Sequence, residues 1–248
     1  MFNNSCYLGF RTMAREKVFR FKQFSVLNDK TAMKVGTDGV LLGAWCNVYN
    51  TKRVLDVGTG SGVISLMIAQ RNNNAVVLGI DIDNDSVCEA RINFNNSPWR
   101  NRLSAQIADY NEFSAGYTFD LIVSNPPFFT NGVLPPDSSR EQARHNTSLT
   151  FTQLISHSAE LLTPTGILAF IAPAESIDEI RRAVVIEKLH IRRLAHVIPV
   201  EGASPKRIMI EISHEDVATV FDTIIIQLAN REYSPEYVNL TRDFYLKM

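Results

Sequence analysis

Short apolar runs alternate with stretches of helical spacing along most of this chain. The apolar runs lie at residues 54–57, 76–80, 119–124 and 167–172, and a further strand is expected at 103–108. Helical spacing follows or precedes them at residues 37–45, 63–70, 86–94, 150–162 and 176–185. Apolar runs without polar alternation indicate strands that are covered on both faces. The alternation therefore predicts an α/β fold, a three-layer sandwich whose central sheet is parallel and has right-handed crossovers.

The two ends of the chain depart from this alternation. Further strands are expected at 191–200, 206–213 and 223–229, and the last two are able to form an antiparallel pair. At the other end, residues 18–24 alternate, so that Phe19 and Phe21 share one face of an edge strand. Its other face carries Arg20, Lys22 and Phe24.

Residues 1–15 show no periodicity, and we expect them to be disordered. The remaining 16–248 are expected to form a single domain, in which a small N-terminal extension of strand and helix, 16–47, precedes a core at 48–248.

The strand at 119–124 ends abruptly, because two successive prolines, Pro126 and Pro127, cannot continue a strand or a helix. A residue before proline is held extended, so the side-chain oxygen of Asn125 and the carbonyl of Pro126 can face a cavity together. With the ring of Phe128 they form two fixed acceptors beside an aromatic surface. Such a set suits a planar amine on a heterocycle. The alternative is a plain turn, since Asn-Pro is also common turn chemistry.

A glycine-rich turn at 58–62 follows the strand at 54–57 and leads directly into a helix. Glycines there let a ligand approach the backbone, and the next strand ends in Asp81, 19 residues beyond Gly62. A carboxylate at that place can accept hydrogen bonds from both hydroxyls of a ribose. A tight structural turn is the alternative, but the pairing with Asp81 favours a nucleotide-type crevice. Asp56, Asp109 and Asn125 should lie at the same edge of the sheet.

Composition narrows the function classes. The chain has 25 basic and 26 acidic residues, a net charge of -1, so any nucleic-acid partner must be bound by a local basic surface. The segment from Arg11 to Lys34 contains seven basic and two acidic residues. This excess of positive charge fits such a surface or an ordinary solvated edge strand. The three scattered cysteines give neither a disulfide framework nor zinc spacing, and no span approaches the roughly 20 apolar residues that cross a membrane. We expect a cytoplasmic protein without a metal or a membrane partner.

These residues resemble the Rossmann-like S-adenosylmethionine-dependent methyltransferases and, more narrowly, the bacterial family that methylates N6 of adenine 37 in a valine tRNA. The broad resemblance rests on 56–62, Asp81, Asp109 and 125–128. The narrow one rests on 21–24, 32–45, Arg140, 143–145 and 243–246, and it covers nearly everything from residue 18 onward. It implies a seven-stranded methyltransferase sheet with an antiparallel last strand, S-adenosylmethionine as cofactor and the anticodon stem-loop of a tRNA as partner. We expect a monomer.

The resemblance also implies roles for particular residues. It assigns the cofactor to Lys34, Thr37, Asp38, Asp56, Gly58, Thr59, Gly60, Asp81, Ile82, Asp109, Tyr110 and Asn125. The backbone of Gly58 and Gly60 would hold the methionine part, Asp81 the ribose and Asp109 the adenine amino group. Thr37 and Asp38 would close over the carboxyl and amino ends of the cofactor.

For catalysis, the resemblance points to Asn125, Pro126, Pro127 and Phe128. Asn125 and Pro126 would accept the N6 hydrogens while Phe128 stacks on the base. The RNA would contact Arg20, Lys22, Lys34, Arg140, Arg144 and His145. A methyl sulfonium is already a strong electrophile, so alignment is the main requirement, and no metal or nucleophile is needed. His145 could instead be read as a base, but the methylated amine loses its proton unaided, which favours a substrate contact or a solvated side chain.

Other functions remain compatible with the same residues. The Asn-Pro-Pro-aromatic tip also serves methyltransferases that act on a glutamine of release factors, guanine N2 of ribosomal RNA or adenine in DNA. A nicotinamide-dependent dehydrogenase has a similar glycine turn and ribose acid, but the tip at 125–128 argues against it. A cofactor-binding RNA chaperone without activity is a third alternative, against which the intact Asn125 speaks.

Overall fold

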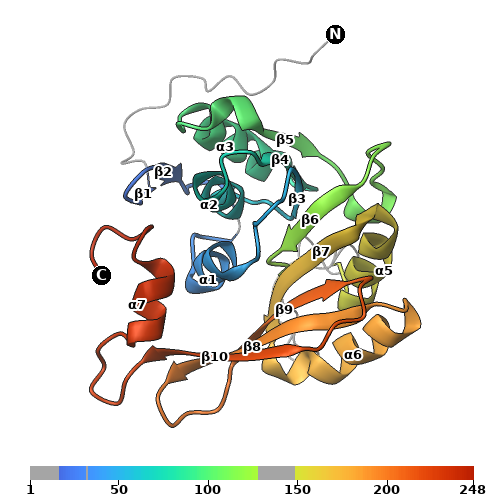
Figure 1. The fold of residues 1–248 in the computed structure, drawn as a ribbon. Helices are drawn as coiled ribbons and strands as arrows, with labels where there is room; N and C mark the ends of the chain where they lie inside the picture. Colours follow the sequence, from blue (N-terminus) through green and yellow to red (C-terminus); the bar gives the residue numbers. More distant parts are fainter. Residues whose placement is uncertain (1–16, 32, 128–148) are drawn as a thin grey trace, which may run out of the picture.

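The computed structural model describes residues 17–31, 33–127 and 149–248 of the chain (Figure 1). Within these residues the main sheet has eight strands in the order β10-β8-β9-β7-β6-β3-β4-β5, and β1 and β2 form a separate two-stranded sheet. The strands are β1 Val18–Arg20, β2 Ser25–Leu27, β3 Arg53–Val57, β4 Val76–Asp81, β5 Leu103–Ile107, β6 Phe119–Ser124, β7 Leu162–Pro173, β8 His190–Val200, β9 Arg207–Ser213 and β10 Val220–Gln227.

Helices cover both faces of the main sheet. Figure 1 shows α1, α2, α3 and α7 on one side and α5 and α6 on the other. Their bounds are α1 Thr37–Trp45, α2 Val63–Arg71, α3 Asn84–Asn95, α5 Phe151–Leu161, α6 Ile177–Ile186 and α7 Pro235–Thr241, with short 3-10 turns η1 Arg100–Arg102, η2 Tyr110–Glu112 and η3 Ala174–Ser176. The predicted three-layer α/β sandwich is therefore confirmed.

Two separate apolar cores explain why the strands read as continuous apolar runs. Val54 and Leu121 face the core beneath α1, α2 and α3, whereas their neighbours Leu55 and Ile122 face the core beneath α5 and α6. Because successive strand residues point to opposite faces, a sheet that is covered on both sides needs apolar residues at every position.

The sheet contains one strand more than expected. Its first seven strands along the chain end in β9, which runs antiparallel to both β7 and β8, as the resemblance implied. The eighth strand, β10, pairs in parallel with β8, so the expectation that 206–213 and 223–229 pair with each other is wrong. Both edges of β9 are already occupied by β7 and β8, so β10 pairs with the outer edge of β8 instead.

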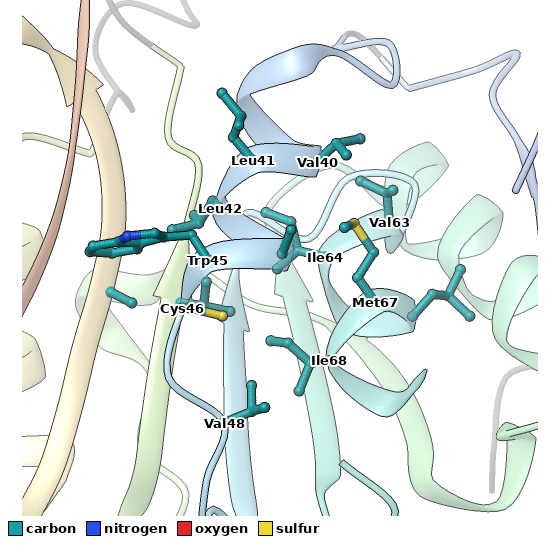
Figure 2. Packing of buried hydrophobic residues seen from close by; sticks show 14 of the residues in the cluster. Val40, Leu41, Leu42, Trp45, Cys46, Val48, Val63, Ile64, Met67 and Ile68 are labelled. Carbon is teal, nitrogen blue, oxygen red and sulfur yellow. The ribbon is translucent and has the colours of Figure 1, made fainter. Parts of the chain in front are cut away.

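Helices α1 and α2 pack closely against each other (Figure 2). A side-chain carbon at Gly43 of α1 would lie 2.8 Å from Sδ of Met67 on α2, so only glycine permits this approach. Leu41 and Leu42 of α1 are fully buried. The middle of α1 is thereby fixed on α2.

The N-terminal hairpin differs from the expected straight strand. The chain turns after β1, so that Phe24 is buried and stacks on Phe21 with ring centroids 4.5 Å apart. The prediction that Phe24 shares the basic face was therefore wrong, because a turn at 21–24 resets the alternation. Phe21 also forms a β-bridge with Tyr245, which ties the hairpin to the C-terminal segment.

Two buried polar residues of α3 hold the chain between β2 and α1. Glu89 accepts hydrogen bonds from the backbone N–H groups of Asp29, Lys30 and Thr31, at 2.7, 3.0 and 3.1 Å. Asn93 accepts from the N–H of Leu27 at 2.7 Å and donates to its carbonyl at 3.0 Å. The segment that leads to α1 is thus anchored on the helix that follows β4.

The cysteines, the absence of a membrane span and the division of the domain were further expectations. Cys46 is a buried free thiol, and Cys88 is disulfide-bonded although the scattered cysteines indicated no disulfide framework. Within the described ranges, no helix is both long and apolar enough to cross a membrane. The division of the domain near residue 47 stays a prediction.

Replacing Glu89 with alanine should destabilise the fold. Three backbone N–H groups would lose a charged acceptor in a buried place, which should lower the free energy of unfolding by about 2–4 kcal/mol. Urea denaturation measures this change. Asn95→Ala, an exposed change on the same helix, is the control and should alter stability by less than about 0.5 kcal/mol. Equal effects of the two substitutions would contradict the anchoring role of Glu89.

Candidate functional site

The parallel register brings the carboxyl ends of four strands to one edge of the sheet. Val57, near the end of β3, lies opposite Ile80 of β4 and Ser124 of β6, and Asp81 lies opposite Ile107 of β5. The segments that follow these strands must therefore meet at this edge, where open α/β sheets bind their ligands. We call this the carboxyl edge.

The glycine turn after β3 leaves an open backbone surface at the carboxyl edge. Gly58 and Gly60 have φ angles of +69° and +54°, which L side chains rarely adopt, and a side-chain carbon at Gly58 would meet nothing within 4 Å. Gly62 is a glycine for a different reason, since a side-chain carbon there would lie 2.4 Å from the ring of Phe94. The turn is held in place by the N–H groups of Gly58 and Thr59, which both donate to the carbonyl of Ile80 at 2.9 Å.

Asp56 lies buried beneath this turn. Its Oδ2 accepts hydrogen bonds from the hydroxyls of Thr59, at 2.8 Å, and Ser65, at 2.6 Å. Its Oδ1 has no hydrogen-bond partner among the described residues. Burial raises the pKa of Asp56 from 3.8 to about 6, because the charged form loses its hydration. A buried acceptor thus remains unused next to the open turn.

Asp81 connects the end of β4 to the glycine turn. One carboxylate oxygen accepts from the N–H of Gly60 at 2.9 Å, and the other accepts from the N–H of Asp83 at 2.9 Å. Burial raises the pKa of Asp81. Each oxygen keeps a second acceptor position, which suits a diol. The neighbouring Ile82 is 53% exposed and offers an apolar surface at the same edge.

Asp109 and Tyr110 follow β5, and they differ in how far their side chains are exposed. The partly buried Asp109 caps the 3-10 turn η2 by accepting from the N–H of Asn111 at 2.9 Å. The side chain of Tyr110 is buried in the core, and its hydroxyl forms a hydrogen bond of 2.7 Å with that of Ser158. Burial raises the pKa of Tyr110. Tyr110 can therefore offer a ligand only its backbone.

Asn125 stands at the tip of β6 with an unused acceptor. The strand end is fixed by the hydroxyl of Ser124, which donates to the carbonyl of Val57 at 2.9 Å. The side-chain oxygen of Asn125 is buried, yet it has no hydrogen-bond partner among the described residues. Leaving a buried acceptor unpaired costs about 1–3 kcal/mol, so a ligand that donates a hydrogen bond here would be favoured.

The start of α1 lies beside this amide. A side-chain carbon at Gly39 would be 3.7 Å from Nδ2 of Asn125. Neither Thr37 nor Asp38 caps the helix: Gly36 occupies the N-cap position, and no side-chain hydrogen bond is made there. Asp38 instead accepts from Nε of Arg207 on β9 at 2.9 Å.

The residues expected to contact RNA are only partly described. Arg20 is exposed, and within the described ranges its side chain has no hydrogen bond or ion pair. The ammonium of Lys22 donates to the carbonyl of Arg242 at 2.6 Å. That of Lys34 donates to the carbonyls of Asp29 and Thr31 at 2.8 and 2.9 Å, so it fastens the loop before α1. Phe128, Arg140, Arg144 and His145 lie outside the described residues.

The roles of several residues of this site were not predicted from the sequence. Ser65 holds Asp56, Glu89 and Asn93 anchor the segment before α1, and Arg207 pairs with Asp38. Ser65 is nine residues from Asp56, but the partners of Glu89, Asn93 and Arg207 are distant in sequence, and no local pattern indicates those contacts. No group of three or more His, Cys, Asp or Glu side chains able to hold a metal ion occurs in the part of the chain that the structure describes.

A cavity also lies at the opposite edge of the sheet. It has a volume of about 530 Å³ and is lined by residues at or near the amino ends of β3, β4, β5 and β6. There the guanidinium of Arg53 lies over the ring of Tyr117, 5.2 Å from its centroid. Because this cavity is separated from the glycine turn and Asn125 by the length of the strands, it is not part of the candidate site.

Comparison with known proteins agrees with this geometry. Residues 36–179 match the model of the methyltransferase small domain. The chain is similar to the tRNA1(Val) (adenine(37)-N6)-methyltransferases of Phocaeicola vulgatus, with 43% identity over 93% of this chain and 98% of the relative, and of Escherichia coli strain SE11, with 36% identity over 96% and 98%.

Among solved structures, a predicted O-methyltransferase from Agrobacterium tumefaciens superposes with a TM-score of 0.66. The alignment covers 84% of this chain and 96% of that one, at 17% identity. At this low identity the likeness supports the fold alone.

The raised pKa of Asp56 predicts an unusual pH dependence of stability. The carboxyl holds its proton more tightly in the folded state than in the unfolded state, so its ionisation lowers the free energy of unfolding as the pH rises from about 4 to about 6. Asp56→Asn removes this loss. Relative to the unaltered protein, the variant should gain roughly 2–3 kcal/mol across this window. Urea denaturation at about pH 4 and pH 7 measures it, and a constant difference between the two proteins would contradict the raised pKa.

Proposed function

Because the chain belongs to the family of the tRNA1(Val) (adenine(37)-N6)-methyltransferases, we propose that it transfers the methyl group of S-adenosylmethionine to the N6 amine of adenine 37 in a valine tRNA. One observation carries the proposal. The buried side-chain oxygen of Asn125 is left without a partner at the same edge as the glycine turn and Asp81. An amine and a nucleoside cofactor can therefore be held next to each other.

The carboxyl edge has the groups that S-adenosylmethionine requires. The open backbone at Gly58 and Gly60 would receive the methionine part, and Asp81 the ribose. Asp109 would accept from the adenine amine, against the exposed apolar side chain of Ile82. When bound, the cofactor supplies an electrophilic methyl group on sulfur. The chain itself then has to bind the cofactor and the substrate, orient them and keep out water.

Asn125 has an orienting role in this proposal. Its side-chain oxygen and the carbonyl of Pro126 would accept the two N6 hydrogens, which turns the lone pair of the amine toward the methyl group. An amide oxygen is too weakly basic at neutral pH to remove a proton, so Asn125 does not act as a base. The ring of Phe128 would stack on the adenine, a role that rests on the resemblance.

The substrate base must leave its stack to reach Asn125. An anticodon loop is already partly unstacked, so extruding one of its bases costs less than opening a duplex. The net charge is only -1, so the phosphate contacts must be local. Exposed Arg20 is available for such a contact, whereas the ammonium groups of Lys22 and Lys34 already donate to backbone carbonyls. We propose that the protein acts on the anticodon stem-loop as a cytoplasmic monomer.

Asp81→Ala should weaken the binding of S-adenosylmethionine by about 1.5–3 kcal/mol, because the ribose loses a charged acceptor. Isothermal calorimetry measures the affinity. Asp83→Ala, a change of the same type at an exposed position two residues along, is the control and should leave the affinity nearly unchanged. Tight binding of a nicotinamide dinucleotide, with none of S-adenosylmethionine, would overturn the cofactor assignment.

Arg20→Ala should weaken tRNA binding and reduce its dependence on salt. One lost phosphate contact lowers the slope of log K against log salt by about one. Titrations of tRNA at several salt concentrations measure the slope. Arg181→Ala, on α6 in the opposite helical layer, is the matched control. If both substitutions change the slope equally, Arg20 is not a specific contact.

The substrate is tested by offering labelled methyl donor with tRNA, ribosomal RNA, DNA or a release factor. We expect label in valine tRNA, and its loss when adenine 37 is replaced with guanine. Mass spectrometry of the digested tRNA should find N6-methyladenosine. Label in ribosomal RNA, DNA or a release factor, with none in tRNA, would keep the amine chemistry but refute the substrate. Label in none of them would leave a cofactor-binding chaperone as the better interpretation.

A further inference from the structure

We infer that Arg207 is a positioning residue for this reaction: through its ion pair with Asp38 it fixes the first turn of α1 against the amide of Asn125. The inference rests on the proposed function for its effect on turnover. Its structural part, the fixing of the turn, stands on contacts between three elements that are far apart in sequence, namely α1, β6 and β9.

The pair joins a helix start to the interior of the sheet. Nε of Arg207 donates to Oδ2 of Asp38 at 2.9 Å, and the two side chains are 34% and 30% exposed. Arg207 is the first residue of β9 and lies opposite Pro173 of β7 and Val197 of β8. Because β9 has a neighbour on each side, the backbone of Arg207 cannot move without the sheet. It is a firm anchor for Asp38.

The first turn of α1 needs such an anchor. Its N-cap residue, Gly36, has no side chain to accept the free N–H groups, and the first hydrogen bond of the helix, from Val40 to Gly36, is long at 3.3 Å. Packing fixes the middle of the helix, where Gly43 meets Met67. Asp38 itself favours the helix start through the helix dipole, and its pair with Arg207 sets where that start lies.

The anchored turn lies beside the proposed catalytic amide. Gly39 follows Asp38 directly, and a side-chain carbon there would be 3.7 Å from Nδ2 of Asn125. The backbone at Gly39 is therefore next to this amide. If the turn shifts, the amide gains freedom to rotate, and its oxygen no longer points steadily at the amine. A misplacement of about 1 Å can cost about 100-fold in rate.

This arrangement gives Asp38 a role different from direct cofactor binding. Its charge is already balanced by the guanidinium of Arg207, so the amino group of the cofactor does not have to compensate it. Asp38 would then act through the position of α1. Loss of the pair should consequently lower turnover more than it lowers cofactor affinity.

Three single variants, one double variant and one matched control test the inference. Arg207→Met and Asp38→Asn each remove the ion pair, and Asp38→Asn does so without disturbing the bond from Arg207 to the carbonyl of Lys206. Arg207→Lys keeps the charge. The control is Asp222→Asn, which removes the pair between Arg193 and Asp222 of β8 and β10, where the side chains are 32% and 31% exposed.

Both pair-breaking variants should lower kcat by about tenfold or more, while the Kd for S-adenosylmethionine changes by less than about threefold. The double variant should be little worse than either single one, because the two residues act as a unit. Arg207→Lys should recover part of the loss. Amide hydrogen exchange at residues 40–42 should become faster in the pair-breaking variants. Asp222→Asn should change neither kcat nor this exchange. Its change in Tm should be similar to that of the pair-breaking variants.

An unchanged kcat and unchanged exchange in Arg207→Met and Asp38→Asn would overturn the inference. So would an equal loss of kcat in Asp222→Asn, or a loss that simply follows the decrease in Tm. If the unaltered protein methylates no tRNA, the proposed function fails, and with it the effect on turnover. The exchange measurement then decides separately whether the pair fixes the first turn of α1.

Discussion

The site depends on the parallel pairing of β3 with both β4 and β6. This pairing places Val57, Ile80 and Ser124 side by side, so the glycine turn, Asp81 and Asn125 leave the sheet at one edge. The two apolar cores on either side keep the three strands in register, since a shift by one residue would exchange the side chains of the two cores. Helix α1 then closes the edge, held by its packing on α2 and by the pair between Asp38 and Arg207.

Two buried acceptors lie unpaired at or beneath this edge, and they reduce the stability of the protein without a ligand. Oδ1 of Asp56 and the side-chain oxygen of Asn125 have no hydrogen-bond partner within the described ranges. Native proteins seldom leave such atoms unpaired, and the exceptions tend to have a function. Oδ1 of Asp56 lies beneath the glycine turn, and the oxygen of Asn125 lies at the tip of β6, where the proposed amine would be bound. The described part of the fold thus keeps two acceptors to which a bound ligand would donate.

Much of the fold and the family could be predicted from the sequence, because the information was local. The apolar runs fixed the strands, the glycines with Asp81 marked the crevice, and the predicted family is confirmed by relatives that align over nearly the whole chain. The errors arose where residues distant in sequence determine the pairing of a strand or the burial of a side chain. The pairing of β10 depends on which strand edge is free, and the burial of Phe24 depends on Phe21 after a turn. The contacts of Glu89 and Arg207 span 58–60 and 169 residues, so no local pattern could reveal them.

The central claim is that the unpaired oxygen of Asn125 receives the amine of the target base. The most direct test is to compare Asn125→Ala with the unaltered protein, measuring methyl transfer to valine tRNA in a single turnover and cofactor affinity by calorimetry. The rate should fall by about 100-fold or more, the scale of losing one positioned polar group, while the Kd for S-adenosylmethionine stays nearly the same. A rate that is unchanged, or a loss of rate matched by an equal loss of cofactor affinity, would contradict the claim.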